Sequence, residues 1–291
     1  MTVTLVCSPR SLPREHWVAA AQRASEVNPA NYPRLERLVR AVPDFQLTPE
    51  RIAVVTAKYW GLKGVRLTVG FLDNPPKDLR ARILLHMNAW AKRANVTFVA
   101  SNTNPQVRIA RSNVEPAAGY WSYVGTDILS IKADEPTMNL QDFTMQTPES
   151  EFHRVVRHET GHTLGFPHEH MRGELVAKID PDKAIAYFGR TQGWSPAEVR
   201  QQVLTPIEES TIRGTAHADP NSIMCYQIPG SLTKDGNPII GGRDIDAQDY
   251  SFAALIYPTT KKPKPSGGKP KRPVTRKRPA KPPRKSARKP K

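Results

Sequence analysis

The sequence predicts an α+β domain over residues 59–260, preceded by a helical segment (1–58) and followed by a basic tail (261–291). Three observations predict this fold class. Strand-like segments and one helix fill the first half of the domain, a central helix follows them, and a final helix ends before a run of lysine, arginine and proline. With 291 residues, the chain is long enough to bury a sizeable core.

The N-terminal segment contains two predicted helices. An alanine-rich helix ends near Asn28-Pro29. Thr48 is a candidate N-cap with Pro49 at the first helical position, and the helix that they start reaches about Lys58.

A sheet is predicted from a series of short strands. Residues 65–71 alternate apolar and polar side chains, as in a half-buried strand, and residues 79–95 form an amphipathic helix. Four further strand-like segments follow at 96–100, 106–111, 120–124 and 127–133. Their close spacing favours a mixed or antiparallel sheet over repeated strand–helix–strand units.

Two later helices complete the predicted domain. The central helix covers residues 148–164. An irregular stretch follows, within which Ser195 and Glu198 form a capping box. The last helix starts at Asp246 and is stopped by Pro258.

The positive charge of the chain is concentrated in its tail. Residues 261–291 hold 15 of the 43 lysines and arginines and no acidic residue, which leaves 28 basic against 27 acidic residues in the rest. Eight prolines and few apolar residues predict a disordered tail. Binding of nucleic acid or another polyanion by this tail is one expectation, and a solvated tail without a partner is the other.

Composition excludes several classes of protein. Two cysteines cannot form a disulfide framework, and the sequence has no CxxC pair for a thiolate zinc site. No apolar run approaches the length of a membrane span. No leader is recognised at the N-terminus, so we expect a cytoplasmic protein or one exported without a leader.

The central helix carries the pattern HExxH at residues 158–162. Histidines four residues apart project from one helical face, so His158 and His162 can bind the same cation. Glu159 then lies beside the cation without being a ligand, where it can take a proton from metal-bound water. The sequence therefore predicts a metal-dependent hydrolase.

The pattern continues to HExxHxxGxxH, which adds a third histidine. Gly165 can adopt a positive φ and end the helix, so that the chain turns back and His168 supplies a third nitrogen. Three histidines leave one tetrahedral position for water, which is the arrangement of a catalytic zinc site. We therefore expect one Zn²⁺ per chain.

These residues resemble the metzincin metalloproteases, and within them the astacin family. The zinc motif runs on as Gly165-Phe166-Pro167-His168-Glu169-His170-Met171-Arg172, which is similar to the astacin pattern GFxHExxR. The segment 222–226 reads SIMCY and resembles the astacin Met-turn, and 121–125 reads WSYVG. The resemblance extends from about Trp60 to Pro258.

The resemblance implies a metzincin-type zinc endopeptidase that acts on peptides or proteins. It implies that His158, His162 and His168 bind zinc and that Glu159 is the general base. It also implies that Met224 packs beneath the metal, and that Tyr226 approaches the zinc as a displaceable ligand and stabilises the tetrahedral intermediate.

The sequence departs from the family in three respects. The cysteines of the two astacin disulfides are missing, because Cys7 and Cys225 are the only cysteines. Residues 1–58 stand in the place of a propeptide but contain no FxGD-like aspartate switch. Glu169 matches a residue that pairs with the processed N-terminus in astacins, and its role here is left open.

The sequence leaves two alternatives to a peptidase open. One is a polyanion-binding protein that acts through its tail, with the zinc domain as a scaffold. The other is a zinc hydrolase of a non-peptide amide, which would use the same ligands and base. The remaining histidines are expected to be surface or satisfied polar residues rather than ligands: His16, His86, His153, His170 and His217.

Overall fold

The computed structural model describes residues 7, 10–41, 47–206 and 217–259. By its contacts the chain divides into residues 1–260 and residues 261–291. The predicted basic tail lies outside the described residues. Among the described residues, no helix has the length and apolar character needed to cross a membrane.

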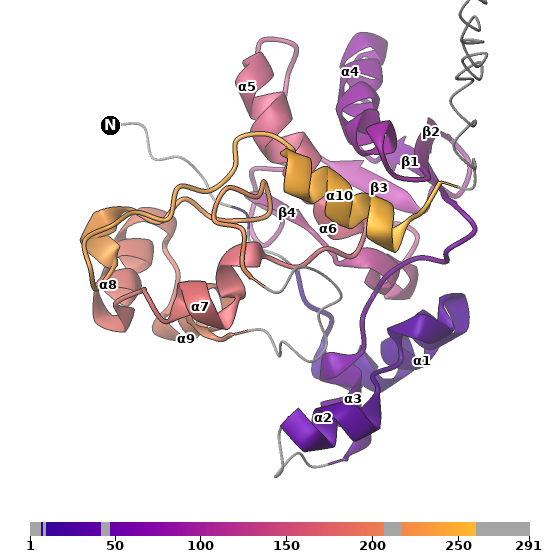
Figure 1. The fold of residues 1–291 in the computed structure, drawn as a ribbon. Helices are drawn as coiled ribbons and strands as arrows, with labels where there is room; N and C mark the ends of the chain where they lie inside the picture. The colour runs from indigo at the N-terminus through magenta and orange to yellow at the C-terminus, as the bar shows by residue number, and fades with distance from the viewer. Residues whose placement is uncertain (1–6, 8–9, 42–46, 207–216, 260–291) are drawn as a thin grey trace, which may run out of the picture. The chain divides into compact units, whose positions relative to one another are not determined.

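A five-stranded mixed sheet forms the centre of the domain, in the order β2-β1-β3-β5-β4. The strands are β1 (Val65–Phe71), β2 (Val96–Ala100), β3 (Val107–Ala110), β4 (Tyr120–Ser122) and β5 (Met138–Leu140). β1 pairs in parallel with β2 and β3, and β3 pairs in parallel with β5. β4 is antiparallel to β5 and forms an edge of the sheet (Figure 1). The predicted mixed sheet is therefore confirmed.

One predicted strand is wrong and one strand was missed. Residues 127–133 were expected to be extended, but Gly125–Ser130 form the 3₁₀ helix η4. Gly125 has a φ of +51°, and the N–H of the next residue donates to the carbonyl of Lys58, so a distant segment fixes this turn. β5 has all three side chains buried, so it lacks the alternation that marks a half-buried strand.

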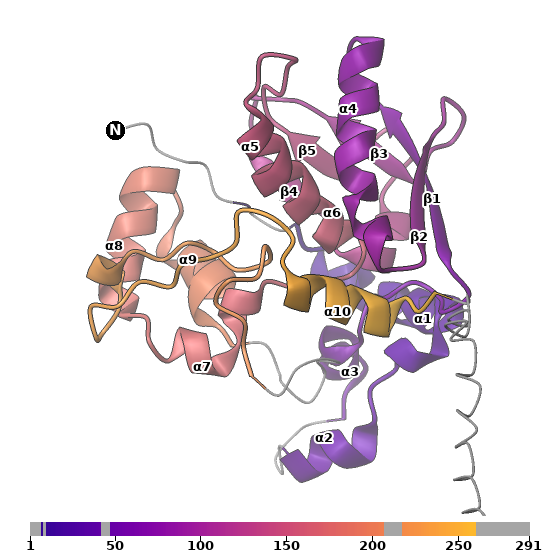
Figure 2. The same ribbon diagram turned by 45° about the horizontal axis from the view of Figure 1, so that its top comes forward.

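Two helices lie side by side over one face of the sheet (Figure 2). The first is α4 (Lys77–Met87), which continues as the 3₁₀ helix η3 (Asn88–Lys92). The predicted single helix tightens there because the Asn88 amide bonds both the N–H and the carbonyl of Phe98 in β2. The second runs without a break through α5 (Glu149–Glu151), the π-helical turn η5 (Phe152–Val156) and α6 (Arg157–Thr163).

A group of short helices forms a second lobe beside the sheet (Figure 1). It contains η6 (Glu169–Met171), α7 (Gly173–Val176), α8 (Pro181–Gln192), α9 (Pro196–Val199), η7 (Arg200–Leu204) and η9 (Gly230–Leu232). The predicted capping box opens α9. α8 was missed within a stretch read as irregular, although Asp180 caps it and Pro181 starts it.

The N-terminal segment packs as η1 (Arg14–His16), α1 (Trp17–Val27), η2 (Pro29–Asn31), α2 (Leu35–Ala41) and α3 (Pro49–Val55). α3 ends about three residues before the predicted Lys58. Beyond it the chain is extended, because the Asn31 side chain bonds both the N–H and the carbonyl of Tyr59. These bonds tie the N-terminal segment to the start of the predicted catalytic domain.

Two apolar cores lie on either side of the zinc motif. The larger fills the space between the sheet, α4, the α5–α6 helix and α10 (Ala247–Ile256), with Trp90 and Tyr257 fully buried. The smaller lies within the second lobe and includes Phe188, Cys225 and Tyr226. The chain between Met224 and Tyr226 therefore passes from one core to the other.

Candidate active site

The three motif histidines converge at the end of α6. The helix ends where expected, since Gly165 has a φ of +93° and the N–H of Phe166 bonds back to the carbonyl of Gly161. His168 follows in extended conformation. Its Nε2 lies 3.1 Å from Nε2 of His158 and 3.1 Å from Nε2 of His162.

Hydrogen bonds orient two of these imidazole rings. Nδ1 of His158 lies 2.6 Å from the carbonyl oxygen of Ile223, and Nδ1 of His162 lies 2.8 Å from that of Phe166. In each ring the Nδ1–H donates to the carbonyl, which leaves the lone pair of Nε2 directed at the common point. Burial lowers the pKa of His158 to about 4 and the pKa values of His162 and His168 well below their ordinary value, so the ligand nitrogens are neutral.

This arrangement fits zinc. Tetrahedral coordination at Zn–N distances of about 2.1 Å separates ligand nitrogens by about 3.4 Å, close to the observed spacings. Neutral imidazoles are the ligands that a catalytic zinc site uses. The predicted metal ligands are therefore brought together.

Met224 packs against α6 at Gly161. A Cβ atom on Gly161 would come within 2.4 Å of Sδ of Met224, so the glycine in HExxH makes room for this side chain. The turn is held by Asp249, which accepts hydrogen bonds from the Ser222 hydroxyl and the Ile223 N–H. Because Ile223 also holds His158, the turn supports the histidine cluster from below.

Glu159 is buried beside the cluster. Burial raises the pKa of its carboxyl group to about 8. Its Oε2 accepts a hydrogen bond from Sγ of Cys7 at 3.4 Å. One sulfur from the N-terminal segment therefore contacts the predicted base.

Cys7 is the site residue that sequence reasoning missed. Its Sγ and one ring nitrogen of each of His158, His162 and His168 all lie within 4.8 Å of one another. A thiolate is a good zinc ligand. No sequence pattern marks this cysteine, because it lies 152 positions before Glu159 and only the fold brings it there.

Tyr226 contacts the backbone of Cys7, whereas Glu159 contacts its thiol. The Tyr226 hydroxyl donates a hydrogen bond to the carbonyl of Cys7. Its ring stacks on the imidazole of His170, with centroids 4.0 Å apart and planes 18° apart. His170 in turn accepts from the N–H of Tyr226 and lies 3.0 Å from the carbonyl of Gln202 through Nε2. His170 is thus a satisfied polar residue that positions Tyr226, as expected for a histidine outside the motif.

Two described residues of the N-terminal segment lie beside the free edge of the sheet at β4. Cys7 and Arg10 form parallel bridges with Tyr120 and Tyr123, and the Arg10 guanidinium covers the ring of Trp121 at 4.8 Å. These two residues therefore lie against the free edge of the sheet.

A cavity of about 480 Å³ adjoins the cluster. It lies between the two lobes, with His158 and Glu159 on one side and Tyr187 and Arg190 of α8 on the other. Tyr226 lines it as well. A cavity of this volume is large enough for a peptide side chain.

Glu169 is held away from the cluster. It accepts a hydrogen bond from the N–H of Asp219 at 3.0 Å and lies 3.5 Å from the Arg172 guanidinium. Cys7 and Cys225 are both free thiols.

Known proteins share this domain. The model of the astacin peptidase family matches residues 56–181. A solved structure of myroilysin is 32% identical, with a TM-score of 0.65, over 72% of this chain and 99% of the other. The chain belongs to the astacin family. The family assignment and the α+β metzincin fold predicted from the motifs are thereby confirmed.

A second structure of myroilysin and one further relative agree with this astacin assignment. A crystal structure of myroilysin is 31% identical with a TM-score of 0.53, over 69% of this chain and 86% of that one. The zinc metalloproteinase nas-27 of Caenorhabditis elegans is 28% identical over 197 residues. This match covers 67% of the present chain and 40% of the nematode protein, so the chain spans less than half of that relative.

Proposed function

We propose that this chain is a zinc endopeptidase in which Glu159 is the general base. The observation that carries the proposal is the convergence of three imidazole Nε2 atoms beside the buried carboxyl group of Glu159, which lines the cavity. Family membership supports a zinc-dependent peptidase, and the residues that perform each step are inferred from their geometry. One zinc per chain at this cluster is part of the proposal.

His158, His162 and His168 would hold the metal. A zinc ion held by them would act as a Lewis acid for the hydrolysis of a peptide bond. The Glu159 carboxylate would accept the proton of the attacking water and later give it to the leaving amine. Its raised pKa, caused by burial, suits a group that must take up a proton and release it again.

Tyr226 would donate a hydrogen bond to the oxygen on which charge develops. Its hydroxyl already donates to a peptide carbonyl, that of Cys7, so it can donate to a carbonyl oxygen beside the histidine cluster. The stack on His170 fixes the ring in this direction. This contact supports the role that the sequence resemblance implies.

We infer that the described conformation is a latent one. Cys7 and Arg10 are bridged to the sheet edge at β4, where a substrate backbone would bind, and Cys7 offers the cluster a fourth ligand atom. Both contacts must be released before a peptide can enter. Residues 1–58 would then act as a pro-segment and residues 59–260 as the catalytic domain.

Hydrolysis of denatured casein tests the proposed function. The full chain carrying Cys7→Ala should release peptides, and a zinc chelator should abolish this activity until zinc is restored. Absence of hydrolysis at full zinc content would contradict the proposal. The polyanion alternative concerns residues outside the described part of the chain and stays a prediction.

A further inference from the structure

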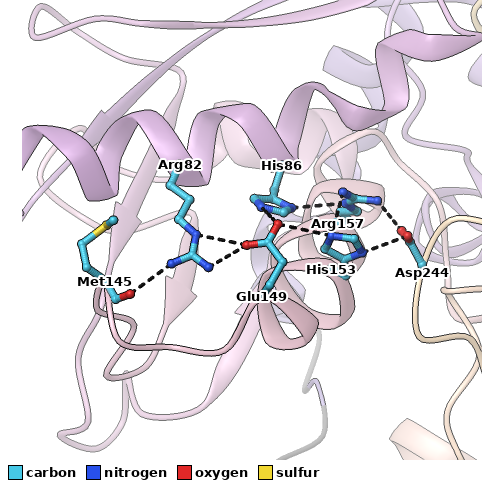
Figure 3. A network of polar contacts seen from close by, with 7 residues as sticks. All are labelled: Arg82, His86, Met145, Glu149, His153, Arg157 and Asp244. Carbon is cyan, nitrogen blue, oxygen red and sulfur yellow. Dashed lines mark hydrogen bonds and ion pairs between the residues drawn. The ribbon is translucent and has the colours of Figure 1, made fainter.

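A second cluster of side chains that could hold a metal ion lies between α4 and the helical run of α5 and η5 (Figure 3). It brings together His86 from the last turn of α4, Glu149 from the start of α5 and His153 from η5. None of these residues lines the catalytic cavity. The cluster therefore has no part in the proposed hydrolysis.

The three potential ligand atoms face one another. Oε1 of Glu149 lies 3.1 Å from Nε2 of His86 and 3.4 Å from Nε2 of His153. A single cation bound at about 2.1 Å from nitrogen and oxygen ligands would separate them by such distances. Glu149 and His153 are four residues apart on one helical run, which gives them a common face.

Neighbouring charges hold two of the ligands in place. Arg82 bonds the other carboxylate oxygen of Glu149, at 2.6 Å and 3.2 Å, which leaves Oε1 free to face the histidines. Nδ1 of His153 lies 2.9 Å from Asp244, so the Nδ1–H donates to this carboxylate and the lone pair of Nε2 points into the cluster. A carboxylate behind a histidine is a frequent support of metal sites.

His86 contributes a buried nitrogen without a hydrogen-bond partner among the described residues. Its side chain is 2% exposed, and the 3.1 Å contact of Nε2 with Glu149 is not aligned as a hydrogen bond. Burial lowers the pKa of this imidazole, so the ring is neutral. Without a metal, Nδ1 accepts a hydrogen bond from Arg157 and the ring proton is on Nε2; a cation bound to Nε2 requires this proton to move to Nδ1.

Arg157 opposes a cation at this position. Its guanidinium lies 3.2 Å from Nε2 of His153 and 3.3 Å from Nδ1 of His86, while Asp244 anchors it at 2.5 Å. A bound cation would displace the two histidine contacts and leave the bond to Asp244. The site would therefore be weaker than the catalytic one.

We propose that His86, Glu149 and His153 form a second divalent-metal site, selective for borderline ions such as Zn²⁺ or Co²⁺. Two imidazoles and one carboxylate match the preferences of these ions, and Glu149, whose side chain is 58% exposed, gives access from solvent. The count expected from the sequence, one zinc per chain, then applies to the catalytic site alone. Part of this site is visible in the sequence, because Glu149 and His153 form the pattern Glu-x-x-x-His on one helical run. The third ligand, His86, comes from a separate helix.

Equilibrium dialysis of the full chain against micromolar free zinc tests this site. Bound zinc should rise from one to two equivalents per chain. Glu149→Gln and His153→Ala should each lower the affinity for the second zinc at least about tenfold. A loss of this size is seen even when the mutated residue only supports a metal ligand through a hydrogen bond. The first equivalent should remain, and it reports that these variants are folded.

Two further variants sharpen the test. His217→Ala removes an 87% exposed histidine that also faces a glutamate, at 3.5 Å, and should keep both equivalents. Arg157→Gln removes the opposing charge and should tighten the second site, whereas a network that only supports the fold predicts no gain in affinity. The proposal would be overturned if the unmodified chain bound a single equivalent of zinc. It would also be overturned if Glu149→Gln and His153→Ala both still bound two equivalents with unchanged affinity, or if Arg157→Gln bound the second zinc more weakly.

Discussion

The thiol of Cys7 lies 3.4 Å from the carboxylate of Glu159, although 152 positions separate them along the chain. The backbone of the same cysteine is bonded by Tyr226 and bridged to the edge strand β4. One residue of the N-terminal segment thus contacts the proposed base, the proposed oxyanion donor and the proposed peptide-binding edge. Latency and catalysis therefore depend on the same few atoms.

Cys7→Ala should raise the peptidase activity of the full chain several-fold. Among the described residues of the segment, its thiol is the side-chain group that reaches the histidine cluster, so its loss frees the metal and Glu159. Initial rates on a quenched peptide measure the effect. Ser11→Ala, an exposed position on the same segment, serves as the control and should leave the rate unchanged. An unchanged rate in Cys7→Ala would contradict the proposal that Cys7 keeps the enzyme latent.

His162→Ala should lose most of the zinc that remains after dialysis against metal-free buffer. Removal of one of three nitrogen ligands leaves a site with two, which cannot complete a catalytic coordination shell. Metal analysis of the purified protein should give close to one equivalent for the unmodified chain. Full zinc retention by the variant would show that the metal binds elsewhere.

The sequence predicts the fold well where a local signal exists. β1, β2 and α10 lie where alternation and capping place them. The 3₁₀ helix η4 was mistaken for a strand because contacts with Lys58, not its own pattern, decide its conformation. β5 carries no alternation because it is buried on both faces.

The candidate site likewise contains residues that the sequence predicts and residues that only the fold brings together. The spacing of His158, His162 and His168 requires one helix and one turn, so it could be read from the sequence. The position of Cys7 could not be read from the sequence, because only the tertiary fold brings its thiol to the cluster. The stack of His170 on Tyr226 is likewise a tertiary contact between separate segments.

Tyr226→Phe should lower kcat more than it weakens substrate binding. A hydroxyl that bonds the substrate oxygen mainly in the transition state affects kcat and kcat/KM together. Steady-state kinetics in the Cys7→Ala background separates these parameters. If KM alone rises, Tyr226 is a substrate contact and the proposed role is wrong.

Asp249 should make the stability of the domain depend on pH. Burial raises its pKa from 3.8 to about 6 in the folded chain. Between pH 4 and pH 6 the unfolded chain has released this proton while the folded chain still holds it, so this residue's contribution to stability falls as the pH rises. The shift corresponds to about 3 kcal/mol.

Urea unfolding of the unmodified chain and of Asp249→Asn measures this contribution. The variant has no titrating group at this position. The difference in unfolding free energy, unmodified minus variant, should therefore decrease between about pH 4 and pH 7. A difference that is constant or increases would show that the carboxyl group is not destabilised by burial.

Replacement of Glu159 by glutamine tests the central claim most directly. Both the parent and the variant should carry Cys7→Ala, and their zinc contents should be matched by metal analysis before the rates of peptide hydrolysis are compared. The glutamine amide cannot accept the proton of the attacking water, and general-base catalysis contributes roughly 10²–10⁴-fold. We predict a loss of at least about that size with zinc retained and the fold intact. A variant that hydrolyses the peptide at a rate near that of the parent would contradict the assignment of Glu159 as the general base.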